Sequence, residues 1–241
     1  MSKLALITGA NKGIGLETAR QLGQLGIELL IGARSLEAGE AAAAQLRSEG
    51  LNAQALLIDV NSAASIANAA AEVAGKHKAL DILINNAGVL LDDPAKPQSA
   101  QTLAVWQQTF QTNLFGTVAV TQAFLPLLRQ APAARIVNLS SILASLALHS
   151  DPKSPIYNSQ NPAYNASKSA VNAWTLSLAY ELRDTPIKVN AAHPGHVQTA
   201  MGGKNAPMQI VDGARTSVAL ATLGPDGPSG SFSHLGKVLP W

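Results

Sequence analysis

Short apolar runs alternate with longer Ala-rich segments through the first 140 residues. The apolar runs are rich in Leu, Ile and Val, which favours buried β-strands, and they cover residues 4–8, 27–33, 53–58, 80–85 and 135–139. The segments between them repeat apolar residues with the period of an amphipathic helix, over residues 13–25, 36–49 and 62–77. Strands that alternate with helices in this way predict βαβ units, and therefore a parallel sheet covered by helices on both faces.

The second half of the chain continues this pattern with two interruptions. The longest helical segment covers about residues 163–183, and a strand is expected at 187–192. Residues 145–162 contain Asp-Pro, Ser-Pro and Asn-Pro pairs, which oppose helix and indicate a loop, and we expect this loop to border the substrate entrance and not the cofactor. A stretch rich in Gly, Met and polar residues, about 195–211, is interpreted as a mobile segment. The pattern predicts one domain over residues 1–241, a doubly wound sheet of about seven strands.

Composition narrows the possible classes of protein. A chain of 241 residues with 47% apolar and 13% charged residues suits one domain with a large core. The formal charge of +2 and the absence of a Lys/Arg-rich run argue against nucleic acid as a partner. Without cysteine, the chain cannot form disulfides or cysteine-based metal sites. The apolar run near the N-terminus is too short for a signal peptide or a membrane span, so we expect a cytoplasmic protein with no membrane partner.

A glycine-rich turn follows the first predicted strand and opens the first predicted helix. Gly9, Gly13 and Gly15 give it the spacing G-x-x-x-G-x-G. Glycines allow a tight turn and a close approach of the backbone to a pyrophosphate, which the helix N-terminus stabilises. Taken alone, the motif would also suit an ordinary strand–helix turn. We interpret it as a dinucleotide-binding turn.

With this motif the chain resembles the short-chain dehydrogenase/reductase family. Further matches follow in order: the segment Asn85-Asn86-Ala87-Gly88, then Asn113, Ser141, the pair Tyr164 and Lys168, and Pro194-Gly195 with Thr199. The resemblance implies a Rossmann-type fold and an oxidoreductase of the carbonyl reductase branch. The residues expected to bind its cofactor are Gly9, Asn11, Lys12, Gly13, Ile14, Gly15, Arg34, Asp59, Val60, Asn86, Ala87, Gly88, Tyr164, Lys168, Pro194, Gly195, Val197 and Thr199.

Tyr164 and Lys168 also make chemical sense as a pair. Their i, i+4 spacing places both side chains on one face of a helix. We expect the cation to lower the pKa of the phenol, which starts near 10, and so to prepare Tyr164 as the proton donor. An isolated pair of this kind would more often be an exposed helix pair. Tyr157 is not expected to be the acid, because Pro162 prevents a continuous helix between it and Asn161.

The remaining catalytic roles follow from the resemblance. Ser141 would hydrogen-bond to the substrate oxygen, Lys168 would hold the cofactor ribose, and Asn113 would support a water that links Lys168 to solvent. Ser140 is the competing serine, and neighbouring residues at a strand end point to opposite faces. The match to the family's strand end favours Ser141.

The end of the second predicted strand indicates which nicotinamide cofactor binds. An NAD-binding protein places Asp or Glu there to bond the ribose hydroxyls, whereas this chain has Arg34 and, in the glycine turn, Lys12. Two cations suit a 2′-phosphate, so we expect NADP(H), although both side chains could simply be exposed. Asp59 either contacts the adenine or is the N-cap of the following helix.

We expect a small-molecule carbonyl or alcohol substrate. Apolar pocket walls are assigned to Leu90, Leu91, Ile142, Leu143, Met201 and Met208, with Tyr157 and His196 at the border. No metal site is expected, because His193 and His196 lack a third ligand, and no G-x-S-x-G motif suggests a hydrolase. Two alternatives stay open: a catalytically silent NADPH sensor or scaffold, and an isomerase or epimerase. Residues 145–162 form a short insertion, which leaves both homo-oligomer and monomer possible.

Overall fold

The computed structural model describes residues 2–241 as one eight-stranded sheet with the order β3-β2-β1-β4-β5-β6-β7-β8. Strands β1 to β7 are parallel, and β8 pairs antiparallel with β7. The strands are β1 Leu4–Thr8, β2 Glu28–Ala33, β3 Ala53–Leu57, β4 Ile82–Asn85, β5 Arg135–Leu139, β6 Lys188–Ala192, β7 Ser231–His234 and β8 Lys237–Val238. The prediction of about seven strands missed β8, which is only two residues long.

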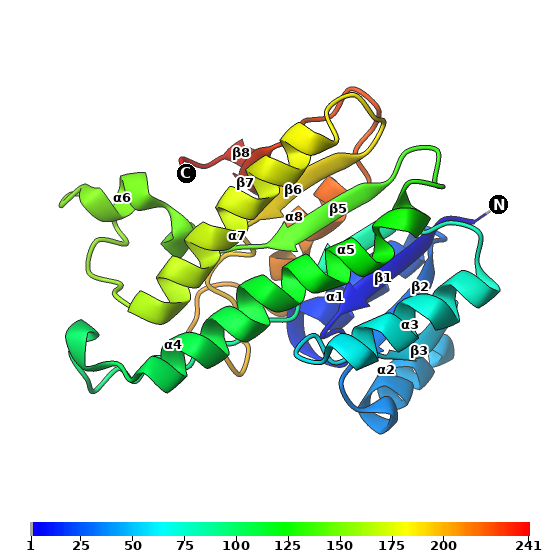
Figure 1. The fold of residues 1–241 in the computed structure, drawn as a ribbon. Coiled ribbons are helices and arrows are strands. Elements are labelled where there is room, and N and C mark those ends of the chain that lie inside the picture. The colour runs from blue at the N-terminus through cyan, green and yellow to red at the C-terminus, as the bar shows by residue number, and fades with distance from the viewer. Residues whose placement is uncertain (1) are drawn as a thin grey trace.

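Helices cover both faces of this sheet, as the pattern predicts (Figure 1). They are α1 Gly13–Gln24, α2 Leu36–Ser48, α3 Ala63–Lys76, α4 Leu103–Phe110, α5 Gly116–Leu128, α6 Leu146–Ser150, α7 Pro162–Glu181 and α8 Ile210–Ala221, with 3-10 turns at Gln98–Ala100 and Ile142–Ala144 and a π-helical turn at Gln111–Phe115. Helices α3, α5 and α7 pack on one face, and α1, α2 and α8 on the other.

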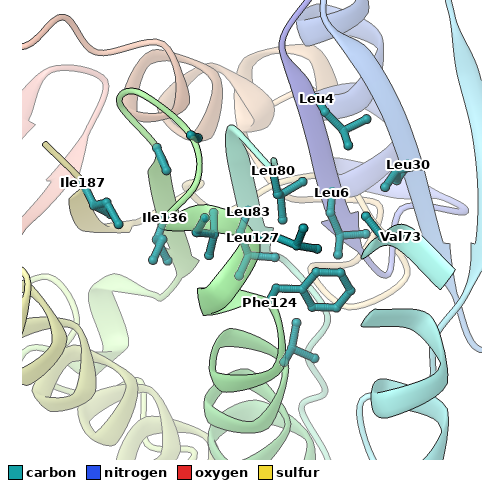
Figure 2. Close-up of a cluster of buried hydrophobic side chains, with 14 of the residues drawn as sticks. Leu4, Leu6, Leu30, Val73, Leu80, Leu83, Phe124, Leu127, Ile136 and Ile187 are labelled. Carbon is teal, nitrogen blue, oxygen red and sulfur yellow. The ribbon is translucent and has the colours of Figure 1, made fainter. Parts of the chain in front are cut away.

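The two faces are filled by alternate residues of the same strands. Leu4 and Leu6 of β1 belong to the core beneath α3 and α5, whereas Ala5 and Ile7 belong to the opposite core. Phe124 of α5 is fully buried and belongs to the first of these cores, where it lies beside Leu6 (Figure 2). Because both faces are covered, the central strands β1, β2 and β4 are mainly apolar, which is why they are visible in the sequence as continuous runs.

Two segments differ from their predicted form. The loop expected at 145–162 contains the short helix α6, which begins after Ser145, whose side chain accepts a hydrogen bond from Leu148 N. The segment expected to be mobile, about 195–211, is tied at its base by a bridge between Val197 and Met208 and ends in α8. Its mobility stays a prediction.

The chain order of the strands fixes the place of a binding site. The chain runs outward from β1 to β3 in one direction, then returns to β4 on the other side of β1. Ligands of open α/β sheets bind at such a reversal, outside the carboxyl ends of the strands. The loops after β1, β4, β5 and β6 all start at this edge, and they carry many of the predicted site residues.

Candidate active site

The glycine turn after β1 is built against the loop that follows β4. Gly9 and Gly13 have φ of 63° and 60°, which favours glycine, and a Cβ on Gly15 would lie 2.4 Å from Asn86 Nδ2. That amide donates hydrogen bonds to the carbonyls of Thr8 and Gly9, at 2.8 and 3.2 Å. The result is a backbone cradle at the N-terminus of α1, and it fits a pyrophosphate.

Lys12 and Arg34 are both exposed next to this cradle. Within residues 2–241 neither forms an ion pair, and Glu37, the first carboxylate after β2, does not pair with Arg34. Two free cations at this position fit a phosphate on the ribose. The chemistry of these side chains therefore suits NADP(H).

Asp59 does not cap the helix that follows it. Its Oδ1 accepts a hydrogen bond from Asn61 N at 2.9 Å, in a local turn. The N-cap of α3 is Ser62, whose Oγ accepts from Ser65 N at 3.2 Å. Asp59 and Val60 are half-buried at the carboxyl end of β3. The N-cap alternative is wrong, and contact with an adenine stays a prediction.

Tyr164 and Lys168 lie in the first turns of α7, and both are buried. Lys168 Nζ is 5.8 Å from the centre of the Tyr164 ring and donates to the carbonyl of Leu139 at 2.7 Å. Burial raises the pKa of Tyr164 to about 12, and a side-chain hydrogen bond with Ser141 opposes this rise. Burial also lowers the pKa of Lys168 to about 8.

The expected lowering of the pKa of Tyr164 by Lys168 is therefore wrong for this structure. A buried phenol loses the solvation that would stabilise its anion, and the neighbouring amine is itself destabilised as a cation. The phenol of Tyr164 therefore stays protonated to a higher pH than an exposed tyrosine does.

The two adjacent serines point in different directions. Ser140 Oγ donates to Asn172 Oδ1 at 2.6 Å inside the protein. Ser141 Oγ accepts from Leu143 N at 3.2 Å, and its side chain is close enough to Tyr164 to oppose the rise in the pKa of the phenol. This arrangement supports Ser141 as the serine of the site.

Asn113 lies in the π-helical turn and clamps the loop after β4. Its Oδ1 accepts from Val89 N at 2.8 Å, and its Nδ2 donates to Val89 O and to Ser167 Oγ, both at 2.9 Å. A Cβ on Gly88 would lie 3.3 Å from Asn113 Oδ1 and 3.4 Å from Lys168 Nζ. Asn113 and Lys168 thus converge on Gly88, where an added Cβ would make a tight contact with both side chains.

Sequence reasoning gave no role to His193, which precedes Pro194-Gly195. Its Nδ1 accepts hydrogen bonds from Ile142 N at 3.1 Å and Gly195 N at 3.3 Å, so it joins the segments after β5 and β6. Burial, reinforced by His234, lowers the pKa of His193 to about 3, which keeps this nitrogen an acceptor. Gly195 has φ of 94° and faces Met208, whose sulfur would lie 2.1 Å from an added Cβ.

The expected substrate residues lie on the loops around this edge. Leu90, Ile142 and Leu143 are half-buried, and the latter two directly follow Ser141. Tyr157, Met201 and His196 are exposed, and the exposed fractions of Tyr157 and Met201 are 39% and 49%. His196 Nε2 is hydrogen-bonded to the carbonyl of Gly202. Tyr157 lies before the start of α7, as expected of a residue that is not the acid.

Fold and site together define a class of protein: a Rossmann-type α/β protein with a dinucleotide cradle and a Tyr/Lys/Ser/Asn constellation at one edge of the sheet. The family model for short chain dehydrogenases matches residues 3–210. The chain belongs to this family.

Comparison with known proteins indicates where in this family the chain lies. The chain is 38% identical over 228 residues to the short-chain dehydrogenase anuI of Penicillium roqueforti, which covers 92% of this chain and 89% of that protein. It is 32% identical over 280 residues to mouse carbonyl reductase [NADPH] 1, covering 99% and 98%. The crystal structure of NADPH-bound carbonyl reductase from chicken fatty liver superposes with a TM-score of 0.86 at 28% identity, covering 100% and 99%. The chain therefore lies near the carbonyl reductase branch.

No helix within residues 2–241 is both long and apolar enough to cross a membrane.

Proposed function

We propose that this protein is an NADP(H)-dependent reductase of aldehyde and ketone carbonyls, reversible as an alcohol dehydrogenase, with Tyr164 as the proton donor. The observation that carries the proposal is the meeting of Tyr164, Ser141 and Lys168 at the strand edge that also holds the glycine cradle. Relatives named as NADPH-dependent carbonyl reductases, aligned over almost the whole chain, support it.

Each side chain has a task that follows from its surroundings. NADPH, when bound, supplies the hydride for the carbonyl carbon. Tyr164 Oη holds the proton for the carbonyl oxygen, and its raised pKa keeps that proton in place until the oxygen becomes basic. Ser141 Oγ hydrogen-bonds to the same oxygen and stabilises the charge that develops on it.

Lys168 and Asn113 support this proton transfer indirectly. With a pKa of about 8, Lys168 Nζ can release a proton near neutral pH and so return one to Tyr164 Oη after turnover. The same nitrogen would contact the cofactor ribose beside Gly88. The side-chain amide of Asn113 is occupied by Val89 and Ser167, so it fixes the loop; its support of a water is part of the proposal.

Tyr164→Phe tests the proposal, because it removes one oxygen and leaves the ring packing intact. We expect kcat to fall by about 10²–10⁴-fold with little change in NADPH affinity. The measurement is NADPH oxidation against a panel of aldehydes, ketones and quinones, with fluorescence titration of NADPH.

Tyr157→Phe is the matched control, since the same atom is removed from an exposed tyrosine of a neighbouring loop. It should leave kcat within about threefold of the unmodified protein. Tight NADPH binding without turnover on any carbonyl would favour the sensor instead, and near-normal turnover in Tyr164→Phe would contradict the assignment of the acid.

A further inference from the structure

A buried carboxylate lies close to the site and has no task in the mechanism above. Asp92, in the loop between β4 and α4, is only 6% exposed. Its Oδ1 accepts a hydrogen bond from Ala163 N at 2.8 Å, and its Oδ2 accepts one from Tyr164 N at 3.0 Å. Both carboxylate oxygens therefore hold the first turn of α7, across 71 residues of sequence.

Helix α7 does not satisfy its own N-terminus. The N-cap residue is Asn161, whose side chain makes no capping hydrogen bond, and Pro162 follows it. By contrast, α2 and α3 are capped locally by Ser35 and Ser62. The first N–H groups of a helix need acceptors, and a negative charge is stabilising there. Asp92, in a loop that is distant in the sequence, supplies both the acceptors and the negative charge.

The other end of that loop is fixed in the cofactor cradle. Asn86 is bonded to the glycine turn, and Val89 is clamped on both sides by Asn113. Only two residues lie between Val89 and Asp92, so the chain between cradle and helix is short. Asn113 links this loop to Ser167 of α7. Asp92 adds a second link, and it bonds to the backbone of Tyr164 itself.

We propose that Asp92 is a positioning residue that locks the first turn of α7 onto the cofactor-side loop and so holds Tyr164 at its working place. The proposal rests on the proposed function, because it concerns the delivery of the proton from Tyr164. A misplacement of about 1 Å can cost about 10²-fold in rate, so a fixed anchor matters for this step.

The test uses Asp92→Asn, which keeps the shape of the side chain but sets an NH2 group against one of the two helix N–H groups. We expect kcat to fall by about 10- to 100-fold, with the Kd for NADPH within about threefold of the unmodified protein. Asp93→Asn is the matched control. It makes the same change one residue later, where the carboxylate bonds only to Ala95 N and Lys96. It should leave kcat unchanged.

A second variant separates positioning from simple helix capping. Asn161→Asp, combined with Asp92→Asn, supplies a carboxylate at the local N-cap and so supports the start of α7 without the link to the cofactor loop. We expect Tm to return toward that of the unmodified protein while kcat stays low. The double variant also allows kcat to be measured if Asp92→Asn alone folds poorly.

The proposal would be overturned if Asn161→Asp restored kcat together with Tm, or if Asp92→Asn kept kcat within about twofold of the unmodified protein. Tyr164→Phe is measured beside these variants. If that variant is inactive and Asp92→Asn is normal, the positioning role fails and the proposed function stands. If Tyr164→Phe is active, the proposed function fails as well.

Discussion

At the scale of single residues, we propose that the choice of cofactor depends on two exposed cations. Arg34 follows β2 directly, and Lys12 lies in the turn after β1. A charge-assisted hydrogen bond contributes about 1.5–3 kcal/mol, so we expect Arg34→Asp to weaken NADPH binding by about 10- to 100-fold and to spare NADH. Fluorescence titration with both nucleotides measures this.

Arg183→Asp, an equal charge change at an exposed arginine just after α7, is the control and should alter neither affinity. Equal Kd values for NADPH and NADH in the unmodified protein would contradict the role given to Arg34.

The sequence predicts which residues meet at the site better than it predicts their chemistry. Tyr164, Lys168 and Ser141 stand where the motifs place them. The direction of the pKa shift of Tyr164 was wrong, because burial is a property of the packed molecule and no motif reports it. Asp92 was missed, and His193 was given no role, for a related reason. Their hydrogen bonds join segments 71 and 51 residues apart, and no local pattern marks such a pair.

At the scale of elements, periodicity was a good guide for β1 to β6, α1, α2, α3 and α7, whereas α5 and α8 were not predicted although each has a buried face. Strands β1 and β5 begin and end at the predicted residues, and α1, α2 and α3 end one residue before the predicted bounds. The short elements escaped prediction. Helix α6 has five residues, none of them buried, and β8 has two exposed residues, so neither leaves an apolar period in the sequence.

Helix α6 is anchored by the last residue of the chain. The carbonyl of Trp241 accepts hydrogen bonds from Ala147 N at 3.1 Å and Ser145 Oγ at 3.3 Å, and its indole stacks on the buried Phe232. Trp241→Ala would remove the stacking that holds this carbonyl. We expect KM for the carbonyl substrate to rise several-fold, about 3- to 10-fold, while Kd for NADPH is unchanged.

Steady-state kinetics and NADPH titration separate the two effects. Val238→Ala, on the exposed strand β8 three residues earlier, is the control and should change neither value. A loss of NADPH affinity in a folded Trp241→Ala protein would show that α6 serves the cofactor and not the substrate.

At the scale of the whole molecule, the two ends of the sheet have separate tasks. The site occupies the carboxyl ends of the strands, while Arg135 is buried at the start of β5. Its guanidinium donates to five backbone carbonyls, those of Ala133, Ala134, Pro186, Leu223 and Gly224. Burial lowers the pKa of Arg135, and only these carbonyls compensate its charge.

Arg135→Met should therefore lower the free energy of unfolding by at least about 3 kcal/mol, because several buried carbonyls lose their partner. Values of kcat and KM should stay near those of the unmodified protein at a temperature where the variant is folded. Urea unfolding gives the first quantity. Arg129→Met removes an exposed ion pair with Glu181 and should cost no more than about 1 kcal/mol. Equal losses in the two variants would argue against a stabilising role specific to Arg135.

The two-residue strand β8 has a consequence for how molecules of this protein meet one another. An unpaired sheet edge offers a row of N–H and C=O groups to any passing chain, and long flat edges promote aggregation. Here the chain turns back at Leu235 and Gly236, both with positive φ, and covers β7 with a short strand that carries Lys237. This border is too short and too charged to serve as a template for an incoming strand. At this end, sheets of neighbouring molecules are not expected to join edge to edge.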